Sequence, residues 1–521
     1  MDAEAKDNDV TPSLDPAARK RHPLLFRVLL GKLRPRWRRG DITVTEEPEV
    51  RRAVRAAALG NAMEWFDYGI YAYLAVTLGN VFYSGAGDGT QTILSLATFA
   101  VSFAVRPLGG AFFGPLGDRV GRKKVLALTM MLMAAATFSI GLIPSYDTIG
   151  LWAPALLILA RLLQGFSTGG EYGGAATFIA EYAPDKRRGY FGSFLELGTL
   201  AGYIGASGLV LVLTAGIGDD AMGSWGWRIP FLIGGPLGAV GLYLRLKLEE
   251  TPAFLKSEAG KAQTEEAAGT AGSPEAGAAS EAGGERAARG PENSPQELKQ
   301  IVARQWRTLL LCIALVAAYN VANYMLLTYM PTHLTEALDW PRTQQLGVVI
   351  VTMVAMIAVV TTVGRLNDRV GRKPLLMAGM VGFLVVTAPA YLLVREGSAV
   401  AVLGGMLLLG GSLICLQGTM SATLPALFPT DIRYGSLSIG YNISVAVFGG
   451  TTPAVIEALV QGLGTSMAAA YYTMAFAVVG IVSVALLKET AGRPLEGSPP
   501  AVATEEEAAE LIREQNRDTA L

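Results

Sequence analysis

The sequence GPLGDRVGRKK at residues 114–124 returns in similar form as GRLNDRVGRKP at residues 364–374. Each copy lies between two long apolar runs, so in each half of the chain a charged loop joins two hydrophobic helices. A second pair of segments follows in the same order, PDKRRG at 184–189 and PTDIRYG at 429–435. Two matched signatures in one order indicate a duplicated membrane domain, which is the architecture of a transporter.

The composition is that of a membrane protein. The 521 residues are 51% hydrophobic and only 17% charged, and their mean hydropathy is +0.37. A soluble chain usually carries about 25% charged residues. Apolar runs of about 20 residues are long enough to cross a bilayer, so we predict an all-α membrane protein with two six-helix halves. The twelve predicted spans are 54–82, 91–115, 124–143, 151–178, 191–214, 228–247, 308–330, 346–364, 374–394, 399–424, 436–459 and 469–487.

Lys and Arg are concentrated in alternate loops. The loops at 83–90, 144–150, 214–227 and 459–468 contain none, whereas both signature loops are rich in them. Because cytoplasmic loops carry the excess of positive charge, we expect both termini and the central loop to be cytoplasmic. The chain is then a multi-pass protein of the cytoplasmic (inner) membrane.

Charge and composition also predict the domain boundaries. We expect a six-helix bundle at 53–250 and a second at 301–490, joined by a linker at 251–300 that is too poor in large apolar residues to fold. Residues 491–521 form a cytoplasmic tail, in which 499–521 predict a short acidic helix. The N-terminal arm, 1–52, is basic. It is either a topogenic segment or an amphipathic arm that binds anionic lipid headgroups.

The first span carries two acids where a membrane helix usually has none. It reads LGNAMEWFDYGIYAYLAV at 59–76, with Glu64 and Asp67 well inside it. A charge at the bilayer centre costs about 2.5–3.5 kcal/mol or more, so such residues usually face a cavity and serve a function. The structural alternative is that either acid pairs with an arginine and joins two helices. Helical spacing places on or beside one stripe Asn61, Glu64, Trp65, Tyr68 and Tyr71.

Two arginines are available as partners for these acids. Arg106 lies in the second span, and Arg161 lies near the middle of the fourth. One turn beyond Arg161, Gly165 and Gly169 have the spacing that lets membrane helices approach closely.

The deep acids of the first half outnumber its deep arginines. There are three such acids, Glu64, Asp67 and Glu171, but only two such arginines, Arg106 and Arg161. One carboxylate is therefore left without a partner. An unpaired carboxylate in a low dielectric takes up and releases a proton near neutral pH, which is what proton coupling requires. We place two other acids outside this count: Glu196, near the cytoplasmic side, and Glu181, a solvated charge at a helix end.

We expect the second half to carry no acid or base inside its spans. Its first span instead offers polar and aromatic side chains, Tyr319, Asn323 and Tyr324 among them. Aromatic faces attract quaternary ammonium groups by about 0.5–2 kcal/mol per ring. The predicted substrate residues are therefore Asn61, Trp65, Tyr68, Tyr71, Tyr319, Asn323 and Tyr324, with an arginine for a carboxylate. The structural alternative is that the tyrosines only line helix contacts or the membrane interface.

The doubled loop suggests a cytoplasmic gate. Its charges can hold the cytoplasmic ends of the two halves together and separate when the halves rock. A purely topogenic role of the arginines is the alternative, although it leaves the Asp and Gly positions unexplained. The predicted gate residues are Asp118, Arg119, Arg122, Asp368, Arg369 and Arg372.

These motifs resemble those of the major facilitator superfamily. LGNAMEWFDYGIYAYLA (59–75), RLLQGFSTGGEYGGA (161–175) and GWRIPF (226–231) are similar to its metabolite–proton symporter branch. NYMLLTYMP (323–331) and KETAGRPL (488–495) look most like the osmoregulatory proline/glycine betaine transporters. The resemblance implies proton symport of zwitterionic osmolytes by alternating access, stimulated by high osmolality.

The leading hypothesis is a symporter that imports proline, glycine betaine or a related compatible solute, with protons as coupling ion and no other cofactor. A dicarboxylate, citrate or shikimate symporter of the same branch is the alternative, but a dianion calls for surplus arginines. A transport-inactive sensor is a third candidate. An enzyme has no support, because only His22 and His333 are present and no nucleophile motif or metal cluster is visible. We expect no nucleic-acid partner.

Overall fold

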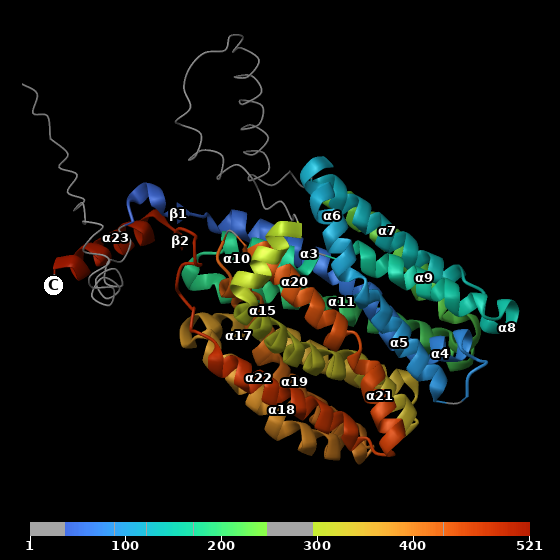
Figure 1. Ribbon diagram of the computed structural model, residues 1–521. Coiled ribbons are helices and arrows are strands. Elements are labelled where there is room, and N and C mark those ends of the chain that lie inside the picture. The colour runs from blue at the N-terminus through green and yellow to red at the C-terminus, as the bar shows by residue number, and fades with distance from the viewer. Residues whose placement is uncertain are drawn as a thin grey trace, which may run out of the picture.

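The computed structural model describes residues 37–87, 89–120, 122–169, 171–246, 295–430 and 432–520. Most of the predicted arm and of the predicted linker lie outside these ranges. All twelve predicted spans fall on helices, so the fold is all-α as the sequence predicts. Figure 1 shows the helices of the first half, blue to green, packed beside those of the second half, olive to red.

Several spans of the first half are interrupted. The first consists of α3 (Glu47–Tyr73) and α4 (Ala75–Phe82), and the second of α5 (Thr90–Ala104) and α6 (Arg106–Val120). The other spans are α7 (Arg122–Leu142), α9 (Trp152–Ser167) with α10 (Glu171–Tyr182), α11 (Arg188–Ile217) and α13 (Arg228–Leu246). Short helical turns between them are α8 (Tyr146–Ile149), η2 (Asp185–Arg187), α12 (Asp219–Ala221) and η3 (Met222–Gly226).

The second half repeats this plan. Its first span runs from α15 (Pro295–Tyr324), which begins within the stretch predicted as linker, through η4 (Met325–Tyr329) into α16 (Met330–Leu338). The middle spans are α17 (Arg342–Val370), α18 (Arg372–Arg395) and α19 (Ala399–Thr423), followed by the turn η5 (Pro425–Leu427). The last two are α20 (Arg433–Ser444) with η6 (Val445–Gly449) and α21 (Thr452–Leu463), and α22 (Met467–Leu486).

The outside of the bundle is apolar. Eight helical segments of the described residues are long and apolar enough to cross a membrane, judged by length and composition, and two shorter apolar helices add to them. Large side chains such as Leu108, Val212 and Leu486 are exposed on this surface. Soluble proteins rarely expose large apolar patches, so this surface suits lipid.

Glycines allow close helix approach in the first half. A Cβ atom at Gly165 would lie 1.6 Å from the carbonyl oxygen of Ser102 on α5. A Cβ atom at Gly169 would lie 2.1 Å from the carbonyl oxygen of Arg106. The close packing predicted from the spacing of these two glycines is confirmed.

The two strands and the last helix lie at one end of the molecule. β1 (Thr43–Val44) follows the turn η1 (Arg39–Asp41) and pairs in parallel with β2 (Ala501–Val502). The predicted acidic helix of the tail is present as α23 (Glu505–Ala520). Figure 1 shows β1, β2 and α23 at one end, and α4, α8 and α21 at the other. We call these the tail end and the far end.

Candidate functional site

Aromatic rings fill part of the space where the two halves meet. Tyr324 of α15 lies 5.6 Å from Phe103 and 5.9 Å from Trp65, measured between ring centroids. Tyr203 also reaches the second half, because its hydroxyl lies 3.0 Å from that of Thr328. These rings lie on the surface along which the halves would separate. We define the aromatic centre as Trp65, Tyr68, Phe99, Phe103, Tyr203 and Tyr324, all buried.

A buried ion pair lies against the aromatic centre. Arg106, the first residue of α6, donates from Nη2 to Oε1 of Glu64 on α3 over 2.7 Å, and both side chains are almost fully buried. The guanidinium carbon lies 5.0 Å from the ring centroid of Tyr68 and 4.6 Å from that of Phe103. One of the two acids in the first span thus pairs with an arginine and also touches the interface between the halves.

Asp67 and Arg161 are connected through two neutral side chains. Arg161 donates to Gln164 over 2.8 Å, Gln164 donates to the Thr137 hydroxyl over 2.7 Å, and Thr137 donates to Asp67 over 3.0 Å. The guanidinium carbon of Arg161 lies 4.3 Å from the ring centroid of Tyr71. Among the described side chains, neither residue of this chain forms a salt bridge. The arrangement leaves Asp67 and Arg161 close but not directly paired.

The predicted surplus of acids can be compared with this geometry. Glu64 takes Arg106 as its partner, and Asp67 reaches Arg161 only through hydrogen-bonded intermediaries. The side chain of Glu171 lies outside the described part of the structure. Which carboxylate carries a proton therefore stays a prediction.

A pocket of about 290 Å³ opens on the other side of α3, away from the second half. It lies between α3, α7, α11 and α13 and reaches both Glu64 and Asp67. Its wall is otherwise apolar, formed by residues such as Phe66, Met133 and Leu237. Asp67 thus faces the interior of the first half, whereas Glu64 lies between this pocket and the aromatic centre.

Three of the predicted substrate residues use their polar atoms within one half. Asn61 donates to the Leu195 carbonyl over 2.8 Å and to the Thr199 hydroxyl over 2.7 Å, which ties α3 to α11. Tyr71 donates to the Ser95 carbonyl on α5. Asn323 accepts from Gln417 on α19 over 3.0 Å. By contrast, Trp65, Tyr68 and Tyr324 lie in the aromatic centre.

Tyr319 contacts an acid to which the sequence assigns no role. Its hydroxyl donates to Oε2 of Glu196 over 2.9 Å, and Tyr172 donates to Oε1 over 3.0 Å. The Glu196 residue is 1% exposed. The sequence does contain a sign that Glu196 is buried, because Glu196, Thr199 and Tyr203 recur at helical spacing within an apolar run.

The second half also holds a buried acid, so the expectation that its spans contain none is wrong. Glu457 of α21 is 3% exposed and accepts from Tyr329 over 3.0 Å and from Gln461 over 2.7 Å. The same Gln461 amide donates to the Gly89 carbonyl of the first half over 3.1 Å. Glu457 is hard to recognise in the sequence, because one Glu hardly lowers the mean hydropathy of the span at 436–459.

At the tail end, Asp368 joins the two halves. Its carboxylate accepts from the backbone N–H groups of Gly189 over 2.6 Å and of Tyr190 over 2.8 Å, at the start of α11. A carboxylate at a helix N-terminus is stabilised by the free N–H groups and the helix dipole. Of the other predicted gate residues, Arg369 is exposed, and the side chains of Asp118, Arg119 and Arg122 lie outside the described part.

A second contact between the halves involves Glu181. This acid is exposed at a helix end, as we expected, and it also forms a salt bridge of 2.7 Å with Arg433 of the second half. Arg433 is fully buried, whereas the Glu181 side chain is 40% exposed. Arg433 and Arg188 occupy matching places in the second signature pair. Each begins a helix and donates from Nε to a backbone carbonyl, Pro425 and Ala180 respectively.

The tail runs across both of these arginines. Arg188 donates to the Arg493 carbonyl over 3.1 Å, and Arg433 donates to the Glu496 carbonyl over 3.1 Å. Glu489 lies just before the tail and accepts from the backbone N–H of Arg372. Burial opposes ionisation of Glu489, but four backbone N–H donors outweigh it and hold its pKa below the usual range.

The halves also touch at the far end. Thr92 donates to Glu336 over 3.0 Å, and Arg342 donates to the Thr77 hydroxyl. Together with the bond from Gln461 to Gly89, these contacts cross from one half to the other. The structure therefore has contacts between the halves at both ends, with the aromatic centre enclosed.

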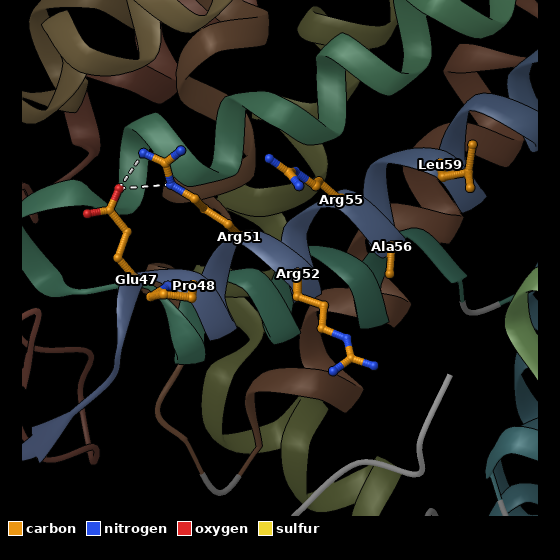
Figure 2. A pocket seen from close by; sticks show the side chains of 7 residues that line it. All are labelled: Glu47, Pro48, Arg51, Arg52, Arg55, Ala56 and Leu59. Atoms are coloured by element: carbon orange, nitrogen blue, oxygen red, sulfur yellow. Dashed lines mark hydrogen bonds and ion pairs between the residues drawn. The ribbon is translucent and has the colours of Figure 1, made fainter. Parts of the chain in front are cut away.

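A basic pocket of about 890 Å³ lies on α3 at the tail end. Figure 2 shows the Glu47 carboxylate in contact with Arg51, while Arg52 points away from this pair. Arg55 lines the same pocket. Among the described residues, no group of three His, Cys, Asp or Glu side chains could hold a metal ion.

Two halves of six helices, a buried ion pair at their interface and contacts at both ends define a membrane transporter. The chain matches the family model described as "Sugar (and other) transporter" over residues 53–501. It is 45% identical over 475 residues to the proline/betaine transporter of Escherichia coli K12, covering 91% of this chain and 90% of that protein. It is 44% identical over 476 residues to the glycine betaine/proline/ectoine/pipecolic acid transporter OusA of Dickeya dadantii, covering 91% of both.

Solved structures show the same fold at lower identity. The major facilitator superfamily proton:xylose symporter XylE matches with a TM-score of 0.62 and 17% identity, over 86% of this chain and 98% of that one. Its partially occluded inward-open form matches with a TM-score of 0.63 and 16% identity, over 86% and 99%. The chain belongs to the sugar (and other) transporter family, and it has the fold of the major facilitator superfamily symporter XylE.

Proposed function

We propose that this protein imports zwitterionic compatible solutes, such as proline and glycine betaine, together with protons by alternating access, and that high osmolality stimulates it. The observation that carries the proposal is the buried Glu64–Arg106 pair against the aromatic centre, where the halves meet. The names of the relatives support the substrate class. An arginine suits a carboxylate and aromatic faces suit an ammonium group, so the two features together suit a zwitterion.

Charge balance favours a zwitterion over a dicarboxylate. Arg106 is already paired with Glu64, and the buried Arg161 stands against two buried acids, Asp67 and Glu196, that have no salt bridge to any described cation. A dianion entering this site would meet more negative than positive charge. A substrate that carries one positive and one negative group adds no net charge. This also weighs against the citrate, dicarboxylate and shikimate alternative.

Proton coupling is assigned to the charges around α3. Asp67 faces the 290 Å³ pocket and reaches Arg161 through Gln164 and Thr137, so a proton on Asp67 would change how Arg161 is held. Arg161 and Phe99 of the aromatic centre are in direct contact, because Arg161 donates to the Phe99 carbonyl over 3.2 Å. Protons serve as the coupling ion, and we propose no cofactor and no enzymatic activity.

The tail end is assigned to the cytoplasm of a cytoplasmic (inner) membrane, with both termini inside. The basic residues Arg51, Arg52 and Arg55 at this end agree with the positive-inside rule. They also continue the basic character of the predicted arm, for which anionic lipid headgroups are the proposed partner. A transport-inactive sensor is disfavoured, because contacts between the halves are present at both ends.

A substrate competition panel tests the proposed substrate class. Purified protein in liposomes takes up labelled proline, and unlabelled glycine betaine, proline, citrate and ketoglutarate compete in turn. We expect the two zwitterions to compete strongly and the two carboxylates to have no effect, with greater uptake in hyperosmotic buffer. Competition by citrate or ketoglutarate without competition by glycine betaine would move the assignment to the alternative.

A further inference from the structure

We propose that Glu196, with the rings of Tyr172, Tyr319 and Tyr441, forms the subsite that binds the ammonium group of the substrate. The inference rests on the proposed function and assigns a location to the positive end of the zwitterion. Glu196 and Tyr172 belong to the first half, on α11 and α10. Tyr319 and Tyr441 belong to the second half, on α15 and α20. The four residues are 1–6% exposed.

The carboxylate is well placed to bind a cation. Each of its oxygens accepts one tyrosine hydroxyl, Tyr172 at Oε1 and Tyr319 at Oε2. A carboxylate offers about four acceptor sites, so the two phenols leave capacity for a further group. Among the described residues, no arginine or lysine forms a salt bridge with Glu196. A buried acid held only by neutral donors is costly in a membrane protein and calls for a functional explanation.

The surrounding rings suit an alkylated ammonium. Tyr172 and Tyr441 stack face to face, with centroids 4.1 Å apart and an angle of 9° between the rings. Because one ring belongs to each half, the stack must part when the halves separate at the tail end. Both faces then become available to a quaternary or secondary ammonium, which binds aromatic faces through their quadrupole.

The subsite is also close to a group for the negative end of the zwitterion. Tyr319 shares α15 with Tyr324 of the aromatic centre, and Phe103, whose ring lies 5.6 Å from that of Tyr324, lies against Arg106. A small zwitterion can therefore place its ammonium at Glu196 and its carboxylate toward Arg106, across the interface of the halves. Binding in this way draws on residues of both halves.

The test compares glycine betaine with its isostere 3,3-dimethylbutanoate, an anion in which an uncharged tert-butyl group replaces the trimethylammonium group. Both compete against labelled glycine betaine in counterflow across liposomes without a proton gradient. For the unmodified protein, we expect the isostere to compete at least about tenfold more weakly than glycine betaine does, since it lacks the cation. In Glu196→Gln, this preference should shrink to about twofold or less, because the amide keeps the shape but loses the charge.

Two further variants make the test decisive. Glu457→Gln removes another buried, tyrosine-bonded acid and should leave the preference unchanged, whatever it does to the rate. Tyr441→Leu removes one ring face and should reduce the preference for glycine betaine several-fold. This variant provides the test if Glu196→Gln does not fold. A full preference in both Glu196→Gln and Tyr441→Leu would overturn the inference.

The outcomes separate the inference from the proposed function. If the unmodified protein exchanges neither glycine betaine nor proline, the proposed function is wrong. If it exchanges them, and Glu196→Gln keeps the preference for the ammonium but loses proton-driven accumulation, then Glu196 carries the proton. That result would overturn the ammonium subsite and leave the transport function intact.

Discussion

Asp67 and Arg161 differ from the neighbouring pair of Glu64 and Arg106 in how they are held. Glu64 and Arg106 touch directly, at 2.7 Å, whereas Thr137 and Gln164 lie between Asp67 and Arg161. A direct buried pair is strongly stabilised in its charged form, while an acid bonded to a hydroxyl can gain or lose a proton with less rearrangement. Asp67 is therefore the better candidate for the coupling proton, and Glu64 for organising the site.

Replacing Asp67 by Asn should separate exchange from accumulation. The amide still accepts a hydrogen bond from Thr137 but cannot cycle between charged and neutral forms. We expect counterflow of labelled proline to continue, while accumulation driven by a proton gradient falls to the equilibrium level. Glu64→Gln serves as the comparison. It leaves Arg106 charged and unpaired, which costs about 3–5 kcal/mol, so both activities should be lost. Accumulation by Asp67→Asn at the unmodified level would refute this assignment.

The sequence identified the buried charges of α3 but not all of their counterparts. Glu64 and Asp67 could be found because acids in an apolar run carry a cost. Glu196 was underrated because its place along the chain suggested the membrane surface, whereas contacts from Tyr172 and Tyr319 bury it. The helical spacing of Glu196, Thr199 and Tyr203 was a local sign of its burial, but the contact from Tyr319 comes from the other half of the chain and has no local sign.

Glycine spacing determines how closely α5 and α9 approach. The Cβ position at Gly165 overlaps the Ser102 carbonyl, whereas at Gly208, within α11, no atom lies within 4 Å. The two glycines have the same chemistry and opposite surroundings. The sequence could predict the first, because small residues four apart are a known packing pattern. The helix break at Leu74 could not be predicted, since no Gly or Pro marks it, whereas Pro107 follows the break at Val105 by two residues.

Gly165→Ala should destabilise the protein, and Gly208→Ala should not. The added methyl group in α9 forces α5 away, and overpacking of this kind costs about 1–3 kcal/mol. In α11 the same change meets open space and gains helix propensity. Thermal unfolding in detergent should show a lower melting temperature for the first variant and an equal or higher one for the second. Equal melting temperatures for all three proteins would contradict the close approach of α5 and α9 at Gly165.

For the whole molecule, the tail end holds several independent contacts between the halves. Asp368 binds the start of α11, Glu181 binds Arg433, and residues of the tail bind arginines of both halves. The repeated loop predicted an interface at this end. It could not reveal that β1 and β2 pair, because residues so far apart in sequence carry no local sign of pairing.

Asp368→Ala should shift the protein toward a state open at the tail end. The substitution removes the acceptor of two N–H groups of α11 and leaves other contacts in place. A cysteine introduced at Ser421, which is buried and bonded to the Gly192 carbonyl, reports this opening by its alkylation rate. With Cys312 and Cys415 replaced by Ser, we expect faster alkylation in Asp368→Ala. The exposed acid Glu396 supplies the control, Glu396→Ala, which should alkylate at the original rate. Equal rates in all three proteins would exclude this role for Asp368.

Proton-driven uptake of a zwitterion into liposomes tests the central claim most directly. Purified protein is reconstituted, a proton gradient is imposed with the interior alkaline, and labelled glycine betaine is followed with and without a protonophore. Coupling through the buried acids of the first half predicts accumulation above the external concentration, which the protonophore abolishes. Uptake that never exceeds the external concentration, or that is indifferent to the protonophore, would contradict proton symport.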